Sequence, residues 1–223
     1  MPTPRHHRLP KVPAIPSDCF YVKLCSNHRD PLFPAATDRG ALNEIMIDEL
    51  LRFDAQLHAY CWLTHHLHAL LEVDAGVLSR FIRRIATRYS QHRHSLSQTR
   101  EHLFERPYQA RRVTTADDFL ALLRFIHLSP VQTMLAVDAA DYPWSSHRAY
   151  LNDDCYSWVT TEIGLGLFAN DVDCARATYR HFIALGLSAD VGRSSRSDAA
   201  CPQSHDRFAA RLHSLLSRTK PWR

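Results

Sequence analysis

The sequence lacks any run of 18 apolar residues, which excludes a membrane-spanning helix. The first sixteen residues lack the apolar stretch of a signal peptide and carry Arg5, Lys11 and several prolines. We therefore predict a flexible N-terminal arm over residues 1–16. Glycine is scarce, with six in 223 residues, and 45% of the residues are apolar against 22% charged. This composition excludes a collagen-like or wholly disordered chain and indicates a globular protein.

Closely spaced cysteines are also missing. The six cysteines stand at positions 19, 25, 61, 155, 174 and 201, and no two of them form a C-x-x-C pair. A zinc-finger framework or a disulfide-bonded secreted scaffold would need tighter spacing or a smaller chain. Cys61 lies in an apolar strand pattern, so we expect it to be a buried thiol. We expect a protein of the reducing cytoplasm with no membrane partner.

Acidic residues are scarce in one part of the chain. Between Arg80 and Arg112 there are nine arginines, no lysine and two glutamates, a net charge of +7 in a protein of net charge +4. A concentration of arginine with so little compensating acid is typical of a surface that binds a phosphate backbone. The alternative is a solvated helix face. We predict DNA contacts from Arg80, Arg83, Arg84, Arg88, Arg111 and Arg112.

Hydrophobic periodicity predicts an order of β-α-β-β-α-β-α followed by a helical tail. Hairpin-linked strands with helices between them indicate an α+β fold. We expect an antiparallel sheet of about four to five strands that helices cover on one face. The expected elements are a strand over 19–25, a helix capped by Thr37 and Asp38 up to about Phe53, strands over 56–63 and 66–73, a helix over 78–92, strand residues at 103–104 and 108–113, a helix from Thr115 that Pro130 breaks or restarts, a turn over 142–146, and helices near 169–185 and 205–218.

Two histidines share one face of the second hairpin strand. Side chains two apart on a strand point the same way, so His66 and His68 lie together while Leu67 faces the opposite side. Two imidazoles so placed form a pair of metal ligands or an acid/base pair. The protein has 15 histidines, so the spacing alone is equally compatible with coincidence.

The residues around this pair resemble a known family. Residues 57–72, LHAYCWLTHHLHALLE, resemble the stretch LHAYCLMPNHVHLLLE of the single-tyrosine HUH transposases, and are most similar to the REP-associated tyrosine transposases. Other segments match the family in the same order over about residues 18–185. They are LSRFI at 78–82, TRYS at 87–90, HLFER at 102–106, FIHLSPV at 125–131, DYPWSSHRAY at 141–150 and ARATYRHFI at 175–183.

The resemblance implies an HUH transposase-like, ferredoxin-like domain over residues 17–152 and a helical extension over 153–187. A linker over 188–204 and a short helix with a basic tail over 205–223 complete the expected organisation. Members of the family bind a DNA hairpin and cut the adjacent single strand during transposition. A divalent metal, Mg²⁺ or Mn²⁺, polarises the scissile phosphate, and a helix-borne tyrosine attacks it. By this resemblance His66 and His68 are metal ligands, and the protein is a monomer or a homodimer.

The sequence departs from the family at the nucleophile. Where the family helix begins Tyr-Ile-His, this chain has Phe125, whose side chain carries no oxygen. One helical turn later the family's Asn, a candidate third metal ligand, is replaced by Ser129. Thr64 and His65 occupy the positions of the Pro-Asn pair that usually precedes the first of the two histidines in the family. An oxygen nucleophile is therefore missing at the family position, and we expect other tyrosines to serve in packing.

Three hypotheses follow from these residues. The chain is an active transposase-like endonuclease, or a non-catalytic hairpin-binding or regulatory protein derived from a transposase, or a metal-dependent hydrolase of another class. The last leaves the arginine-rich segment and the ordered motifs unexplained. Phe125 discriminates between the first two.

Overall fold

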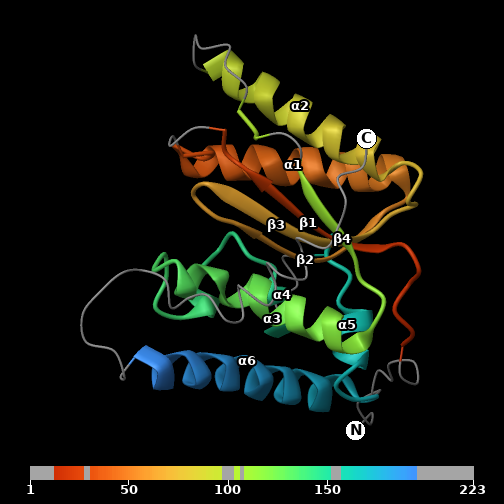
Figure 1. Ribbon diagram of the computed structural model, residues 1–223, viewed down its shortest axis with the longest axis vertical. Helices are drawn as coiled ribbons and strands as arrows, with labels where there is room; N and C mark the ends of the chain where they lie inside the picture. Colours follow the sequence, from red (N-terminus) through yellow and green to blue (C-terminus); the bar gives the residue numbers. More distant parts are fainter. Residues whose placement is uncertain (1–12, 28–30, 97–102, 106–107, 152–156, 195–223) are drawn as a thin grey trace, which may run out of the picture.

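The computed structural model describes residues 13–27, 31–96, 103–105, 108–151 and 157–194. Two layers of helices enclose a sheet, and a further helix packs outside one of them (Figure 1). The main elements in chain order are β1 (Cys19–Cys25), α1 (Ala36–Phe53), β2 (Gln56–Trp62), β3 (His66–Glu72), α2 (Leu78–Leu96), β4 (Gln109–Arg112), α3 (Ala116–Gln132), α4 (His147–Leu151), α5 (Glu162–Gly166) and α6 (Val172–Ser194).

The sheet has four antiparallel strands in the order β2-β3-β1-β4. This confirms the predicted α+β fold, the β2–β3 hairpin and the strand order along the chain. The first strand lies between β3 and β4, so β1 and β3 are the central strands. Their pairing sets Lys23 opposite His68 and Cys25 opposite His66. The strand predicted around 103–104 is a single bridge between Ser26 and Phe104.

Helices cover both faces of the sheet, and the expectation of one covered face is wrong. On one face Trp62 pairs with Leu67, and its indole N–H donates to Asn43 of α1 at 2.7 Å. On the other face the ring of His68 meets Phe125 of α3, with 5.1 Å between centroids. Leu67 and His68 are both 1% exposed. Continuous burial from Leu67 to Leu71, without alternation, is the pattern of a strand packed on both sides.

The outer edge of β2 is covered by the predicted turn at 142–146. The Trp62 N–H donates to the Trp144 carbonyl at 2.9 Å, and the Ser146 N–H donates to the Tyr60 carbonyl at 3.1 Å. Further along the strand, the Thr160 N–H donates to the Leu57 carbonyl at 2.8 Å. These bonds satisfy backbone groups that an open edge strand would leave unpaired.

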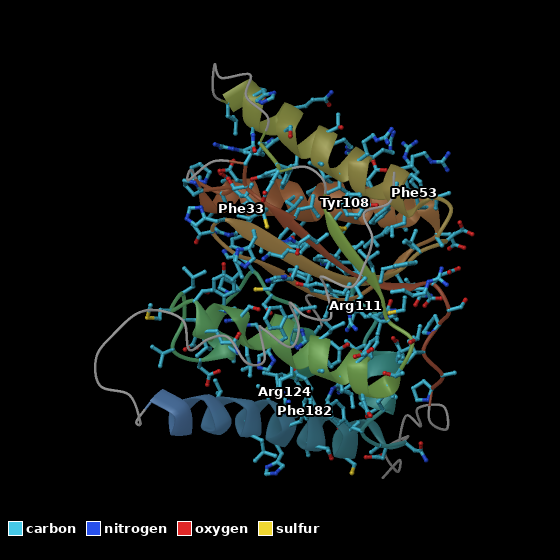
Figure 2. All side chains as sticks on the ribbon, in the orientation of Figure 1. Phe33, Phe53, Tyr108, Arg111, Arg124 and Phe182 are labelled. Atoms are coloured by element: carbon cyan, nitrogen blue, oxygen red, sulfur yellow. The ribbon has the colours of Figure 1, made fainter. Side chains whose placement is uncertain are left out.

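Helix α6 forms an outer layer against α3. The guanidinium of Arg124 lies over the ring of Phe182 at 4.4 Å, between the two helices (Figure 2). The Tyr179 hydroxyl reaches inward to His127 Nδ1 at 2.7 Å. The helix continues to Ser194, beyond the predicted end at residue 185 and into the segment expected to be a linker.

Three predicted helix boundaries change. Helix α1 begins at Ala36, and Asp38 accepts a hydrogen bond from the Ala35 N–H at 2.9 Å, so it acts from within the first turn. Pro130 lies inside α3, and the helix continues for two residues beyond it to Gln132. The proline lacks one backbone N–H, so close to the helix end it removes only one internal hydrogen bond and the helix tolerates it. Helix α2 runs four residues past His92 to Leu96.

Parts of the predicted organisation lie outside the described residues. They are residues 1–12 of the arm, most of the linker and the tail over 205–223. Within the described ranges, no helix is long and apolar enough to cross a membrane.

Candidate DNA-processing site

The two histidines of β3 lie together on the face of the sheet that α3 covers. Their ring centroids are 4.8 Å apart. His68 is fully buried, whereas His66, at the strand end, is half-buried. Burial lowers the pKa of His66 to about 4, with the charges of Lys23 and His65 adding to the effect. Burial also holds the pKa of His68 well below its ordinary value, so both imidazoles are neutral at pH 7.

Tyr21 of β1 is a member of this site that sequence reasoning missed. Its hydroxyl lies 2.7 Å from His68 Nδ1, and both side chains are 1% exposed. The second ring nitrogen of His68, Nε2, is buried and has no hydrogen-bond partner among the described residues. Burial raises the pKa of the Tyr21 phenol, which is therefore protonated at neutral pH. Tyr21 could have been found only by knowing that β1 pairs with β3.

Phe125 takes the position that the family resemblance assigns to the nucleophile. Its ring contacts His68 at 5.1 Å and Tyr21 at 6.5 Å between centroids, both edge to face. The helix therefore brings this position to the histidine pair. What it delivers there is a hydrocarbon ring, which cannot attack a phosphate.

Four other tyrosines, for which the sequence predicts packing roles, form hydrogen bonds outside the histidine site. The hydroxyls of Tyr89, Tyr142 and Tyr150 donate to the backbone carbonyls of residues 32, 62 and 58 at 2.7, 2.7 and 3.0 Å. Tyr108 exchanges a hydrogen bond with Ser79 at 2.9 Å. These contacts agree with packing roles.

Ser129 is buried one helical turn after Phe125, but its hydroxyl serves the helix. It donates to the Phe125 carbonyl at 2.6 Å, a back-bond to the preceding turn. Its role as a ligand stays a prediction. No group of three or more His, Cys, Asp or Glu in the described part of the chain is arranged to hold a metal.

The donor set at this site does not fit a hard divalent cation. Mg²⁺ and Mn²⁺ prefer oxygen ligands, chiefly carboxylates, and this face offers two neutral imidazoles. Lys23, directly opposite His68, adds a positive charge on the same face. Burial is the main cause of the low pKa of both histidines, and the charge of Lys23 lowers the pKa further. The same charge repels a cation at this site.

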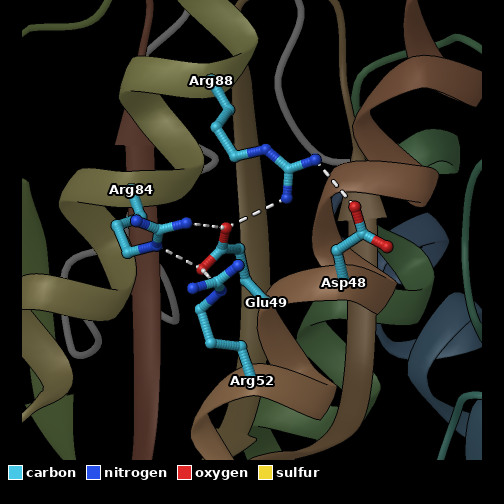
Figure 3. A network of polar contacts seen from close by, with 5 residues as sticks. All are labelled: Asp48, Glu49, Arg52, Arg84 and Arg88. Carbon is cyan, nitrogen blue, oxygen red and sulfur yellow. Dashed lines mark hydrogen bonds and ion pairs between the residues drawn. The ribbon is translucent and has the colours of Figure 1, made fainter.

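The arginine-rich segment is largely paired with acidic residues of α1. Arg84 donates to the buried carboxylate of Glu49 at 2.6 and 2.9 Å, and Arg88 donates to Glu49 at 3.0 Å and to Asp48 at 2.7 Å (Figure 3). The expectation that little acid compensates these arginines is therefore wrong for Arg84 and Arg88. Their partners are distant in the chain, so helical i,i+4 spacing does not reveal them.

The remaining arginines differ in accessibility. Arg80 and Arg83 are exposed on α2, with Arg80 over the ring of Phe53 at 5.3 Å. Arg112 is half exposed and lies 3.5 Å from Asp18. Arg111 points from β4 toward α3 (Figure 2), where it is 9% exposed and bonds to Asp118 at 3.3 Å. Of the six predicted contacts, Arg80, Arg83 and Arg112 are the most exposed, Arg84 and Arg88 are partly exposed within their ion pairs, and Arg111 is buried.

Comparison with solved structures agrees with this architecture. The chain is similar to a REP-associated tyrosine transposase bound to a REP hairpin, with a TM-score of 0.53, 15% identity, and coverage of 72% of this chain and 90% of that one. A proposed transposase from Deinococcus radiodurans R1 aligns with a TM-score of 0.38 and 14% identity, over 60% of this chain and 95% of that one. No protein-family model and no curated protein matches the sequence. This chain has a transposase-like fold, that of the REP-associated tyrosine transposases.

Proposed function

We propose that this chain is a transposase-derived protein that binds hairpin or single-stranded DNA without forming a covalent intermediate. The observation that carries the proposal is Phe125, which packs against His68 where a nucleophile would have to stand. Phenylalanine cannot form a phosphodiester link to DNA. The solved hairpin complex of a protein with this fold supports DNA as the partner.

The exposed arginines of α2 and β4 support the same function. Arg80 and Arg83 supply exposed cationic side chains on α2, and Arg112 supplies one on β4. Phosphate contacts of this kind give most of the affinity for nucleic acid. Arg84 and Arg88 add partly exposed charge, although their first role is to hold α2 against α1.

The test uses a DNA hairpin with a single-stranded flank, in Mg²⁺ or Mn²⁺. We expect binding by fluorescence anisotropy and no protein–DNA adduct after denaturing electrophoresis. An adduct that survives denaturation would refute the non-covalent proposal. An absence of binding to the hairpin, to its flank alone and to a scrambled duplex would refute the DNA-binding function itself.

A second candidate is metal-dependent strand cleavage and rejoining, as in active transposases. The observation in its favour is the unpartnered Nε2 of His68 beside His66, because metal-ligating histidines need one free ring nitrogen. Cleavage by a metal-activated water would not require a nucleophilic side chain at position 125. Nicked, unlinked product that disappears in a His66→Ala variant would support this candidate over simple binding.

A further inference from the structure

A cluster of exposed apolar side chains follows directly after α3. Met134, Leu135 and Val137 are 91%, 42% and 95% exposed, and they are three of the six large apolar side chains that the described residues leave exposed. A single exposed apolar side chain is ordinary on a protein surface, whereas a contiguous apolar patch marks an interaction site. We call residues 134–137 the α3 loop patch.

The backbone holds these side chains at the surface. The N–H groups of Met134 and Leu135 donate to the carbonyls of Val131 and Pro130 at 3.0 and 2.8 Å. Met134 has a φ of 57°, in the left-handed region that a residue with a bulky side chain seldom adopts. A surface fixed in this way loses little conformational entropy when a partner covers it.

Helix α6 ends level with the α3 loop patch. The two helices run side by side in the same direction (Figure 1), with Phe182 at Arg124 and Gly186 against Leu128. Helix α3 ends four residues after Leu128, and α6 ends eight residues after Gly186. At a rise of 1.5 Å per residue, α6 therefore ends about 6 Å beyond α3. The chain after residue 194 starts beside the patch.

Residues 205–218 have the sequence pattern of an amphipathic helix, although they lie outside the part of the chain that the structure describes. Apolar residues recur at positions i, i+4, i+7 and i+8, and three arginines form a second stripe along one flank of them. The apolar residues are Phe208, Leu212, Leu215 and Leu216, and the arginines are Arg207, Arg211 and Arg218. Such a helix needs an apolar surface on which to bury its stripe.

Charge favours this segment as the occupant of the patch. Asp138 and Asp141, both exposed, follow the patch directly. Residues 205–223 carry five basic residues against one acidic residue. The two carboxylates attract these cations, and they repel the phosphate backbone of a nucleic acid. A segment that is both apolar and basic therefore fits the patch better than DNA does.

We propose that residues 205–218 dock as a helix on the α3 loop patch, with the apolar stripe over Met134 and Val137 and the arginines beside Asp138 and Asp141. Docking removes two apolar surfaces from water. The connection through residues 195–204 makes the contact intramolecular, so the effective concentration of the segment at the patch is high. This inference is independent of the proposed DNA binding.

Methionine NMR of the full-length protein reports on the patch, because the chain has only three methionines. With ¹³C-labelled methyl groups, Met134→Leu assigns the Met134 signal, and Met46, which is 2% exposed, serves as the buried reference. A soluble gadolinium chelate broadens the signals of methyl groups that solvent reaches. We expect the Met134 signal to be protected in the wild type, and to shift and broaden in the double variant Leu212→Ser and Leu215→Ser.

The double variant Ala210→Ser and His213→Ser is the matched control. It introduces the same two serines at positions off the apolar stripe, so the Met134 signal should stay protected. The inference is overturned if the chelate broadens the Met134 signal equally in the wild type and in the stripe variant.

Two further measurements test the occupant and the charges. If protection of Met134 is lost on dilution, and Val137→Ser converts a dimer into a monomer in sedimentation velocity, the occupant is a second copy of the chain and the inference is wrong. Asp141→Asn should weaken the protection, whereas Glu44→Gln, at an exposed position of α1, should not. Full protection in Asp141→Asn would overturn the placement of the arginines.

Discussion

The side chain at position 125 is a phenylalanine ring, so this site lacks the nucleophile that a covalent mechanism needs. Phe125 lies against both His68 and Tyr21, so the helix already delivers this position to the histidines. Restoring the hydroxyl alone would nevertheless leave Lys23 opposite His68 and the Ser129 hydroxyl on the helix backbone.

We therefore expect Phe125→Tyr to fold and to remain without a covalent DNA adduct in Mg²⁺ or Mn²⁺. The measurement is denaturing electrophoresis with a labelled hairpin, and circular dichroism monitors folding. An adduct in this single variant would mean that the site still recruits a metal, which would contradict the poor fit of this donor set to a hard cation. Phe125→Leu is the control for disturbing the packing around His68.

Glu49 shows how a single carboxylate can organise arginines that look free in the sequence. It is fully buried between α1 and α2 and accepts three hydrogen bonds from Arg84 and Arg88. These bonds outweigh the effect of burial and hold the pKa of Glu49 below its ordinary value.

Replacing Glu49 by Gln should lower the free energy of unfolding by about 1–3 kcal/mol, because it leaves the arginines facing a neutral group. Urea denaturation followed by circular dichroism measures the change. Asp48→Asn removes the other partner of Arg88, but at a site where the aspartate is 57% exposed, and should cost less than about 1 kcal/mol. Equal losses in the two variants would show that burial of Glu49 is not the cause.

At the scale of elements, local pattern predicted most of the structure. Hydrophobic periodicity predicted β1 to the residue, and it predicted α2, whose apolar residues are buried on one face of the helix. Pairings between distant segments were not accessible in this way. The partners of Arg84 lie on α1, and Tyr21 meets His68 because β1 inserts beside β3, a strand order that no local spacing encodes. The histidine pair was therefore predicted, but its surroundings were not.

A buried polar chain joins α3, α4 and α6. The Tyr179 hydroxyl bridges Nδ1 of His127 and Nδ1 of His147, and His127 Nε2 bonds to Ser146 at 2.7 Å. Burial lowers the pKa of His147 to about 4, against an opposing effect of Asp138, and holds the pKa of His127 well below its ordinary value.

These depressed pKa values predict acid sensitivity. Below pH 6.5 the histidines of the unfolded chain become protonated, whereas the buried histidines of the folded chain stay neutral. The free energy of unfolding therefore falls as the pH drops from 6.5 to about 4. His147 alone accounts for up to about 3 kcal/mol of this loss. Thermal unfolding from pH 8 to 4 should show the decline, and His147→Gln should flatten its slope. His65→Gln, at an exposed position, is the control that loses the same residue type. An unchanged slope in His147→Gln would contradict the assignment.

At the scale of the whole molecule, the histidine pair and the exposed arginines lie on opposite faces of the sheet. His68 faces α3, whereas Arg112 lies over Phe20 on the side of α2, with the guanidinium 5.3 Å from the ring centre. The last strand of the sheet, β4, separates the two surfaces. Under the proposed function, we expect the DNA to pass around the β4 edge, with its hairpin on the arginine side and its single strand on the histidine side.

This arrangement predicts that the two parts of the DNA respond to different variants. Replacing Arg80 and Arg83 by Gln should weaken hairpin binding and reduce the slope of log affinity against log salt by about 1.8, since two phosphate contacts to a duplex are lost. The affinity for the isolated single-stranded flank should change little. Fluorescence anisotropy from 50 to 300 mM KCl measures both. The pair Arg176→Gln and Arg180→Gln removes equal charge from α6 and should keep the wild-type slope. A wild-type slope in the α2 variant would place the hairpin on another surface.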